Sequence, residues 1–145
     1  ATVHSPAVLV EEYIPGTEAT CGVIEHFRGN THYAFPPVEV IPPDGKQFFD
    51  YDAKYSGASQ ELCPASFAAG VKREIEDMAL AAHKALGLRH YSRADFIVSP
   101  RGVYLLEINS LPGLTEQSLL PKAARAVGLS FPQFLDHVLT LALKR

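Results

Sequence analysis

Short apolar runs separated by turn residues fill the first third of the chain, and this pattern predicts a β-sheet. The turns are marked by "IPG" at residues 14–16, "RGN" at 28–30 and "PPDGKQ" at 42–47. Proline pairs at 36–37 and 42–43 limit the hydrogen-bonded ladder between them. The strands that we expect here are Ala7–Val10, Glu18–Phe27, Thr31–Phe35 and Val38–Ile41.

The pattern then changes to helical spacing, which predicts a helix over Phe67–Leu86. Ser66 is placed to cap its start and Gly87 to end it. The apolar residues expected on its buried face are Val71, Ile75, Met78, Ala82 and Leu86.

Two shorter helices are predicted at the end of the chain. The first covers Leu120–Val127 and stops at Gly128. The second covers Phe131–Leu143, where Ser130 and Gln133 form the spacing of a capping box. Strands followed by a helix, a hairpin and two more helices indicate an α+β fold, a mainly antiparallel sheet with helices packed on one face.

Length and composition support a single domain over residues 1–145 with a substantial core. The chain has 145 residues, is 47% hydrophobic and carries a formal charge of -3. No basic run indicates nucleic-acid binding, and no stretch approaches the roughly 18 apolar residues of a membrane span. The cysteines, Cys21 and Cys63, have no metal-binding spacing; we expect reduced thiols and hence a cytoplasmic protein. The first residues read as a chain cut before a strand, so we expect a piece of a longer protein.

The sequence "SPRG" joins two further predicted strands, Ser92–Val98 and Val103–Ile108. A two-residue mirror-image turn needs positive φ at both central positions, which Pro100 cannot adopt. We therefore expect a three-residue loop in which Gly102 is left-handed. Ser99 then faces Val103 across the hairpin.

Counting back from that turn gathers polar side chains on one face. Asp95 falls opposite Glu107, and Arg93 falls opposite Asn109. Because side chains alternate along a strand, all four share a face. The opposite, core face is expected to hold Phe96, Val98, Leu106 and Ile108.

Two opposed carboxylates repel each other unless positive charge lies between them. Carboxylate and amide oxygens at this spacing suit Mg²⁺ or Mn²⁺ together with phosphate oxygens. On spacing alone, a solvated polar face in which Arg93 pairs with a carboxylate carries about the same weight as a metal site. A carboxylate pair of the glycosidase type is a third interpretation.

The segments "RADFIV…GVYLLEINSLPGLTEQSLLPKAARAVGLSF", "VLVEEYIPGTEATCGVI" and "DYDAKYS" together resemble the C-terminal part of D-alanine–D-alanine ligases, members of the ATP-grasp superfamily. The resemblance covers nearly the whole chain in the family's order. It implies the larger ATP-grasp lobe, without the N-terminal substrate domain and most of the smaller lobe. The isolated chain would then bind ATP weakly and catalyse little.

The resemblance assigns roles to individual positions. Arg93 would stabilise the tetrahedral intermediate, and the Gly113 amide would help to hold the substrate or the oxyanion. Ser118, with Leu119 beside it, would bind the carboxylate of the second D-alanine. The implied magnesium ligands are Asp95, Glu107 and Asn109. The implied adenine and ribose contacts are Glu11, Glu12, Tyr13, Ile14 and Glu18. Glu12 stands where some members carry lysine, so only a backbone contact would be retained there.

The irregular residues Asp52–Ser66 have no clear periodicity, and a loop of this length is uncommon unless it is functional or disordered. The resemblance identifies this segment with the mobile loop that closes over the active site. Lys54 would contact the ATP phosphates, and Tyr55 would help to fix the closed state. Tyr55 also favours a dipeptide product over D-alanyl-D-lactate. A plain surface loop is the alternative.

The implied activity is ADP-forming ligation of two D-alanines through an acyl phosphate, for peptidoglycan precursors. It uses ATP and Mg²⁺ (or Mn²⁺), and the full-length protein would be a candidate homodimer. The alternatives are another ATP-grasp carboxylate–amine ligase and a non-catalytic nucleotide-binding module. The histidines, including His83 and His137 on helices, are expected at surfaces or helix edges with no metal role, because no pair has ligand spacing.

Overall fold

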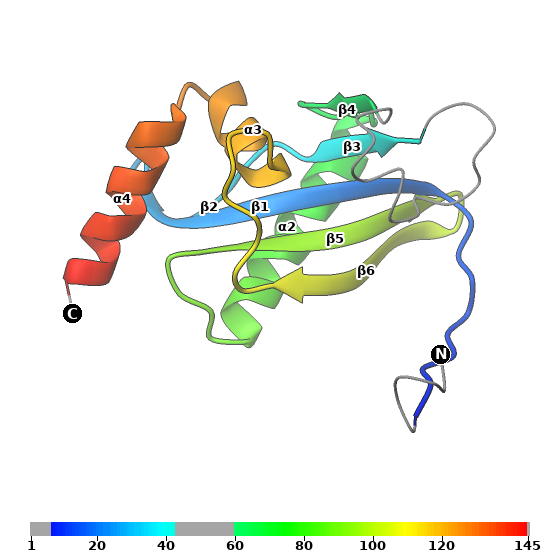
Figure 1. The fold of residues 1–145 in the computed structure, drawn as a ribbon. Helices are drawn as coiled ribbons and strands as arrows, with labels where there is room; N and C mark the ends of the chain where they lie inside the picture. Colours follow the sequence, from blue (N-terminus) through cyan, green and yellow to red (C-terminus); the bar gives the residue numbers. More distant parts are fainter. Residues whose placement is uncertain (1–6, 43–59, 145) are drawn as a thin grey trace.

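The computed structural model describes residues 7–42 and 60–144, and within these ranges the strands form one antiparallel six-stranded sheet (Figure 1). The order across the sheet is β4-β3-β1-β5-β6, with β2 paired to β1. The strands are β1 (Thr17–Phe27), β2 (Asn30–Ala34), β3 (Val38–Ile41), β4 (Gln60–Leu62), β5 (Tyr91–Ser99) and β6 (Gly102–Asn109).

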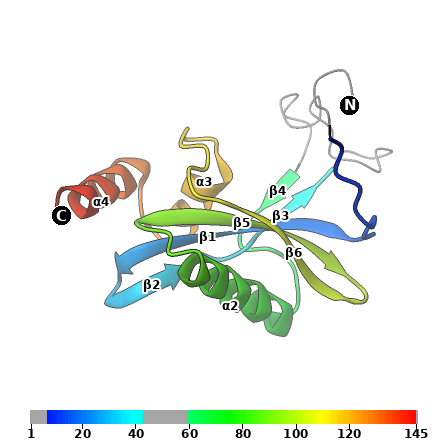
Figure 2. The ribbon, with the colours of Figure 1, turned by 90° about the horizontal axis from the view of Figure 1, so that it is seen from below.

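The helices of the described ranges are α2 (Ala69–Ala85), α3 (Leu119–Ala126) and α4 (Phe131–Leu143). They lie on both sides of the sheet, with α2 on one face and α3 and α4 against the other (Figure 2). The predicted α+β class and antiparallel sheet are confirmed, but the placement of all helices on one face is wrong. The reason is that α3 has an apolar side of its own, Leu120, Ala123 and Ala124, which must also be buried.

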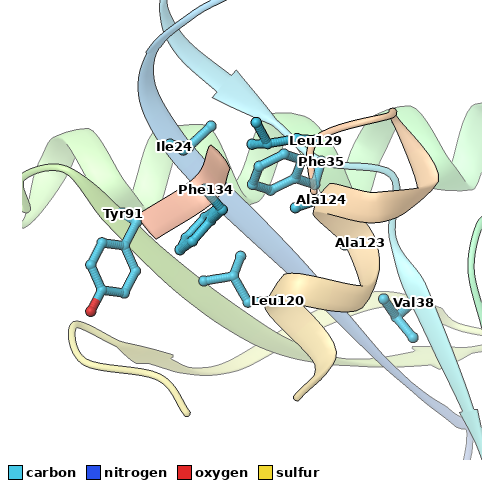
Figure 3. Packing of buried hydrophobic residues seen from close by; sticks show 9 residues of the cluster. All are labelled: Ile24, Phe35, Val38, Tyr91, Leu120, Ala123, Ala124, Leu129 and Phe134. Carbon is cyan, nitrogen blue, oxygen red and sulfur yellow. The ribbon is translucent and has the colours of Figure 1, made fainter. Parts of the chain in front are cut away.

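The first core cluster lies between the sheet and the two C-terminal helices (Figure 3). Phe134 of α4 is fully buried beside Phe35 and Tyr91, with ring centroids 6.5 Å and 5.8 Å away. Leu120 of α3 completes this contact with the sheet. The predicted capping box is present, since Ser130 Oγ accepts from the Gln133 backbone N–H.

The second core cluster lies between the sheet and α2. Its helical side consists of Ile75 and Ala79, with fully buried His83 one turn further along. The stripe therefore runs at i, i+4 and i+8 from Ile75. This corrects the predicted stripe, which ended at Leu86; that side chain is 61% exposed. It also corrects the expectation that His83 lies at a surface or edge.

The ends of α2 show one correct and one wrong prediction. Gly87 follows the helix with φ of +59°, as expected for a glycine that ends a helix. Ser66 does not cap the start, because its backbone N–H and hydroxyl both donate to buried Glu39, at 2.9 Å and 2.6 Å. The N-cap residue is Ala68, which makes no side-chain capping bond.

Two predicted segments differ from the structure. Residues Ala7–Val10 form no strand and are exposed. The predicted loop Asp52–Ser66 is wrong in its last part, because residues 60–62 form β4 against β3. Ala65 is buried there and donates its N–H to the Pro37 carbonyl. Residues 52–59, with Lys54 and Tyr55, lie outside the described residues.

No single described helix has the length and apolar character needed to cross a membrane. Helices α3 and α4 satisfy those criteria only as a pair bent by 104°.

The turn between β5 and β6 differs from the predicted one. Ser99 pairs with Gly102 rather than with Val103, so only Pro100 and Arg101 form the turn. Neither of these two residues has positive φ, in agreement with the restriction on proline. Gly102 has φ of +135°.

A bulge further along the hairpin restores the predicted pairing. The register shifts by one residue between Asp95 and Phe96, and Leu106 is the extra residue of β6. Since a bulged residue no longer follows the alternation, Leu106 is 56% exposed, and its predicted core position is wrong. Beyond the bulge Asp95 pairs with Glu107, as predicted.

Gly22 of β1 allows α3 to reach the sheet. A Cβ atom at this position would lie 2.1 Å from Leu120 Cδ1 and 3.1 Å from Phe35 Cδ2. Gly22 pairs with Arg93 on β5, so the contact lies next to the polar cluster of the hairpin. The close approach explains why a central strand contains glycine here.

We expect Gly22→Ala to lower the free energy of unfolding by about 1–3 kcal/mol, because the added methyl group overpacks the contact with Leu120. Urea denaturation of the purified protein measures this change. Gly70→Ala is the matched control, because a Cβ there meets nothing within 4 Å and alanine suits a helix. Equal stability of the two variants would contradict the packing argument.

Candidate functional site

Arg93, Asp95, Glu107 and Asn109 lie together on one face of the β5–β6 hairpin. Arg93 Nε and Nη2 donate to the two Asp95 carboxylate oxygens at 2.7 Å and 2.8 Å. The Asn109 amide nitrogen lies 3.2 Å from Asp95 Oδ2 and 3.1 Å from Glu107 Oε1. The amide therefore joins the two carboxylates, and all four predicted residues are in one network.

The Arg93–Asp95 pair is shielded from solvent, with side chains 17% and 20% exposed. The hydrogen bonds that Arg93 donates to Asp95 raise the pKa of Arg93 above its ordinary value, and the Asp95 and Glu107 charges act in the same direction. Arg93 is therefore a permanent cation beside two carboxylates. Its bonds to Asp95 use only part of the guanidinium's set of donors.

A depression lies beside this network and connects the hairpin to β1, β3 and α3. Glu18 and Thr20 of β1, Leu106 of β6 and Leu119 of α3 contribute to its lining together with Arg93 and Asp95. Glu18 and Leu119 therefore lie beside the network, and their roles stay predictions. Thr20, which pairs with Asp95 across the β1–β5 ladder, was missed. The sequence does indicate this position, because Thr20 lies two residues after Glu18 on β1 and alternate side chains of a strand share one face.

The segment between β6 and α3 brings Gly113 against Ser118. A Cβ at Gly113 would lie 3.1 Å from Ser118 Oγ. Thr115, which sequence reasoning also missed, holds this hydroxyl with its backbone N–H at 3.0 Å and its own hydroxyl at 2.9 Å. Ser118 is the N-cap residue of α3 but makes no side-chain capping bond. Its hydroxyl lies at a helix N-terminus, where partial positive charge favours anions.

The predicted nucleotide contacts Glu11, Glu12, Tyr13 and Ile14 lie in a segment without helix or strand. Glu12 pairs with Arg101 at the tip of the hairpin, at 2.9 Å, and both side chains are mainly exposed. The structure therefore places Glu12 at the turn, whereas the Asp95–Glu107 pair lies further along the same hairpin. Lys54 and Tyr55 lie outside the described residues and stay predictions.

The donor set fits a hard divalent cation. Asp95 and Glu107 supply carboxylate oxygens that converge on one amide group. A flip of the Asn109 side-chain amide by about 180° would place its oxygen, instead of its nitrogen, beside the two carboxylates. Oxygen ligands of this kind bind Mg²⁺ and Mn²⁺. This interpretation accounts for the asparagine, which neither a glycosidase-type pair nor a simple Arg93 ion pair requires.

The family model described as "D-ala D-ala ligase C-terminus" matches residues 1–140. The chain belongs to this ligase family. Relatives include the D-alanine–D-alanine ligases of Desulfotalea psychrophila, 47% identical over 96% of this chain, and Nitratidesulfovibrio vulgaris, 46% identical over 97%. The chain spans 43% and 45% of those proteins. It therefore matches less than half the length of the curated ligases to which it is similar.

Solved ligase structures share this fold. The D-alanine–D-alanine ligase of Bacillus anthracis, complexed with ATP, is 34% identical with a TM-score of 0.73, over 92% of this chain and 42% of that one. The VanG D-Ala:D-Ser ligase of Enterococcus faecalis is 33% identical with a TM-score of 0.72, over 90% of this chain and 37% of that one. The similarity confirms the predicted ATP-grasp ligase fold.

We expect Arg93→Met to lower the free energy of unfolding by about 1.5–3 kcal/mol, because it removes charged hydrogen bonds from partly buried Asp95. Arg101→Met is the matched control, and it removes only an exposed pair whose contribution is small. Urea denaturation of both variants measures the difference. Equal losses would show that the Arg93–Asp95 pair does not stabilise the hairpin.

Proposed function

We propose that this chain forms the metal-binding and second-substrate-binding part of an ATP-dependent D-alanine–D-alanine ligase. The full protein would join two D-alanines, release ADP and supply peptidoglycan precursors. The gathering of Arg93, Asp95, Glu107 and Asn109 on one hairpin face supports this most directly. The names of the curated relatives and the complex of the Bacillus anthracis ligase with ATP support it further.

The proposed reaction has two steps. The carboxylate of the first D-alanine takes the γ-phosphoryl group of ATP, and the amine of the second D-alanine then displaces phosphate. Phosphoryl transfer depends on charge neutralisation and alignment. Asp95, Glu107 and Asn109 would hold Mg²⁺, which neutralises phosphate charge when bound.

Arg93 would stabilise the oxyanion that forms when the amine attacks the acyl carbon. Its charge is permanent, and Asp95 fixes its orientation through two hydrogen bonds. Fixed donors need no reorganisation as charge develops, which is the physical basis of oxyanion stabilisation. The Gly113 backbone N–H is proposed as a second donor, on the resemblance to the family.

Ser118 would bind the carboxylate of the second D-alanine. Its hydroxyl is held in place by Thr115 and lies at the N-terminus of α3, where backbone N–H groups attract an anion. Leu119, which lines the depression, would border the substrate's methyl group. Gly113 keeps the approach to Ser118 open, because a side chain there would contact the Ser118 hydroxyl.

The remaining roles rest on the sequence resemblance. Glu11, Glu12, Tyr13, Ile14 and Glu18 are proposed to contact the nucleotide. Lys54 and Tyr55 are proposed to close over the phosphates, which would exclude water from the acyl phosphate. We propose a cytoplasmic location, because the described cysteines are free thiols, which suits a reducing compartment. A homodimer stays a prediction.

D-alanine–D-serine ligation is a second candidate activity, because the similarity to VanG nearly equals that to the Bacillus anthracis enzyme. The sheet and the hairpin cluster therefore do not select between the second substrates. The names of the curated relatives favour D-alanine, whereas Tyr55 argues only against D-lactate. Competition between D-alanine, D-serine and D-lactate in one assay separates the products.

We expect Arg93→Ala in the full-length ligase to lower kcat about 10²–10³-fold, as for the loss of an oxyanion donor. ADP release in the presence of ATP, Mg²⁺ and D-alanine measures the rate, and circular dichroism checks folding. Arg73→Ala, exposed on α2 across the sheet, is the control and keeps normal turnover. Full turnover by folded Arg93→Ala would exclude the role of Arg93 in oxyanion stabilisation.

A separate measurement tests the alternative of a non-catalytic module. Failure of Mg·ATP to stabilise the wild-type full-length protein against thermal unfolding would favour that alternative.

We expect Asp95→Asn and Glu107→Gln each to weaken Mn²⁺ binding by at least about tenfold, because each removes one charged ligand from the site. Titration of the purified protein with Mn²⁺, followed by electron paramagnetic resonance, measures the affinity. Asp77→Asn is the matched control, because this exposed carboxylate lies on α2. Unchanged Mn²⁺ affinity in both hairpin variants would place the cation elsewhere.

A further inference from the structure

A second polar cluster lies on the opposite face of the sheet, between β1, β2 and the C-terminal turns of α2. Glu25 pairs with His32 across the β1–β2 ladder. His83 reaches the same place from α2, and its ring centroid lies 5.5 Å from that of His32. One carboxylate oxygen and one ring nitrogen from each histidine lie within 4.8 Å of one another. The ligase chemistry proposed above uses none of these residues.

His83 is the most unusual member of this cluster. Its side chain is fully buried, and its Nε2 has no hydrogen-bond partner among the described residues. An unpaired buried polar atom costs free energy, so such atoms in a core require an explanation. Nε2 is directed towards Glu25 Oε1 at 3.9 Å, beyond hydrogen-bond distance. A ligand between these atoms would satisfy both.

The neighbouring groups hold the cluster in a form that can bind metal. Ser92 Oγ lies 2.7 Å from His83 Nδ1, which orients the ring and leaves Nε2 facing the cluster. Glu25 Oε2 accepts the His90 backbone N–H at 2.7 Å, which leaves Oε1 for the two histidines. Burial lowers the pKa of His83, so the neutral imidazole, the form that binds metals, is favoured.

We propose that Glu25, His32 and His83 form a binding site for a divalent transition-metal ion, for which Zn²⁺ fits best. Two imidazoles and a carboxylate are a frequent zinc ligand set, and a water molecule completes the coordination. With bonds of about 2.0–2.1 Å, neighbouring ligand atoms in a tetrahedral site lie roughly 3.3–3.4 Å apart. Glu25 Oε1 lies 3.7 Å from His32 Nε2 and 3.9 Å from His83 Nε2. Small rotations of the side chains would close these distances.

The imidazole donors distinguish this site from the hairpin cluster. Nitrogen ligands favour Zn²⁺ and related ions, whereas the all-oxygen set around Asp95 favours Mg²⁺ or Mn²⁺. The ion would fasten the β1–β2 hairpin to the end of α2, because His83 comes from the helix and the other ligands from the strands. Binding only to the folded state would stabilise the protein against unfolding.

The test is a Zn²⁺ titration of chelator-treated protein by calorimetry, in excess Mg²⁺ so that the hairpin carboxylates are occupied. We expect binding of one ion per chain and a raised Tm. Co²⁺ in place of Zn²⁺ is expected to give the visible absorption of a four-coordinate site with nitrogen ligands. His32→Gln and Glu25→Gln are each expected to weaken binding at least ~100-fold, since even the loss of an outer-shell partner costs about 10–100-fold.

His26→Asn is the matched control, because His26 adjoins Glu25 in sequence but is exposed and outside the cluster. It is expected to keep full affinity. The variants at His32 and Glu25 change partly exposed side chains, so they test the site even where His83→Gln fails to fold. Three outcomes would each overturn the proposal. They are absence of Zn²⁺ binding to the wild type, wild-type Zn²⁺ affinity in His32→Gln and Glu25→Gln, and loss of Zn²⁺ binding in Glu107→Gln. The result is independent of ligase activity.

Discussion

The pairing of β5 with β6 determines which side chains meet on the face proposed to bind the cation. The turn closes on Ser99 and Gly102, and that register continued without change would pair Glu107 with Ala94. Ala94 is buried against α2, so Glu107 would place a carboxylate in an apolar core, at a large cost in free energy. The bulge at Leu106 adds one residue and moves Glu107 to the face of Asp95. Both the core and the polar cluster therefore depend on this single irregularity.

The position of α3 depends on that same face of the sheet. Gly22 lies beside Arg93 in the β1–β5 ladder and leaves room for Leu120. The N-terminus of α3 is thereby fixed close to the hairpin, with Ser118 as its N-cap residue and Leu119 in the lining of the depression. A catalytic arrangement needs such support, because small displacements of charged groups are costly. The packing of the apolar side of α3 thus positions Ser118, the proposed substrate contact.

The two faces of the sheet carry different chemistry. One face gathers two carboxylates and an amide group beside a permanent cation, Arg93, which suits phosphate and a hard metal ion. The other face packs an apolar cluster against α2 and gathers Glu25, His32 and His83 at the end of that helix. The first set comes from β5 and β6, and the second comes from β1, β2 and α2. Alternation of side chains along the strands keeps them on opposite sides of one thin layer.

Local patterns in the sequence were enough to predict strands β1 to β3, the hairpin strands β5 and β6, all described helices and the polar face of the hairpin. Capping residues such as Ser130 and Gly87 are local signals, and they held, whereas the predicted apolar stripe of α2 needed correction. The pairing of Asp95 with Glu107 was also predicted, although through a wrong turn that the bulge at Leu106 compensated. Tertiary packing alone set the side of the sheet on which α3 lies. It also decided that Ser66 binds Glu39 instead of capping α2, and that His83 lies buried beside Glu25 and His32. These outcomes depend on contacts between segments far apart in the chain, and no local periodicity or spacing records such contacts.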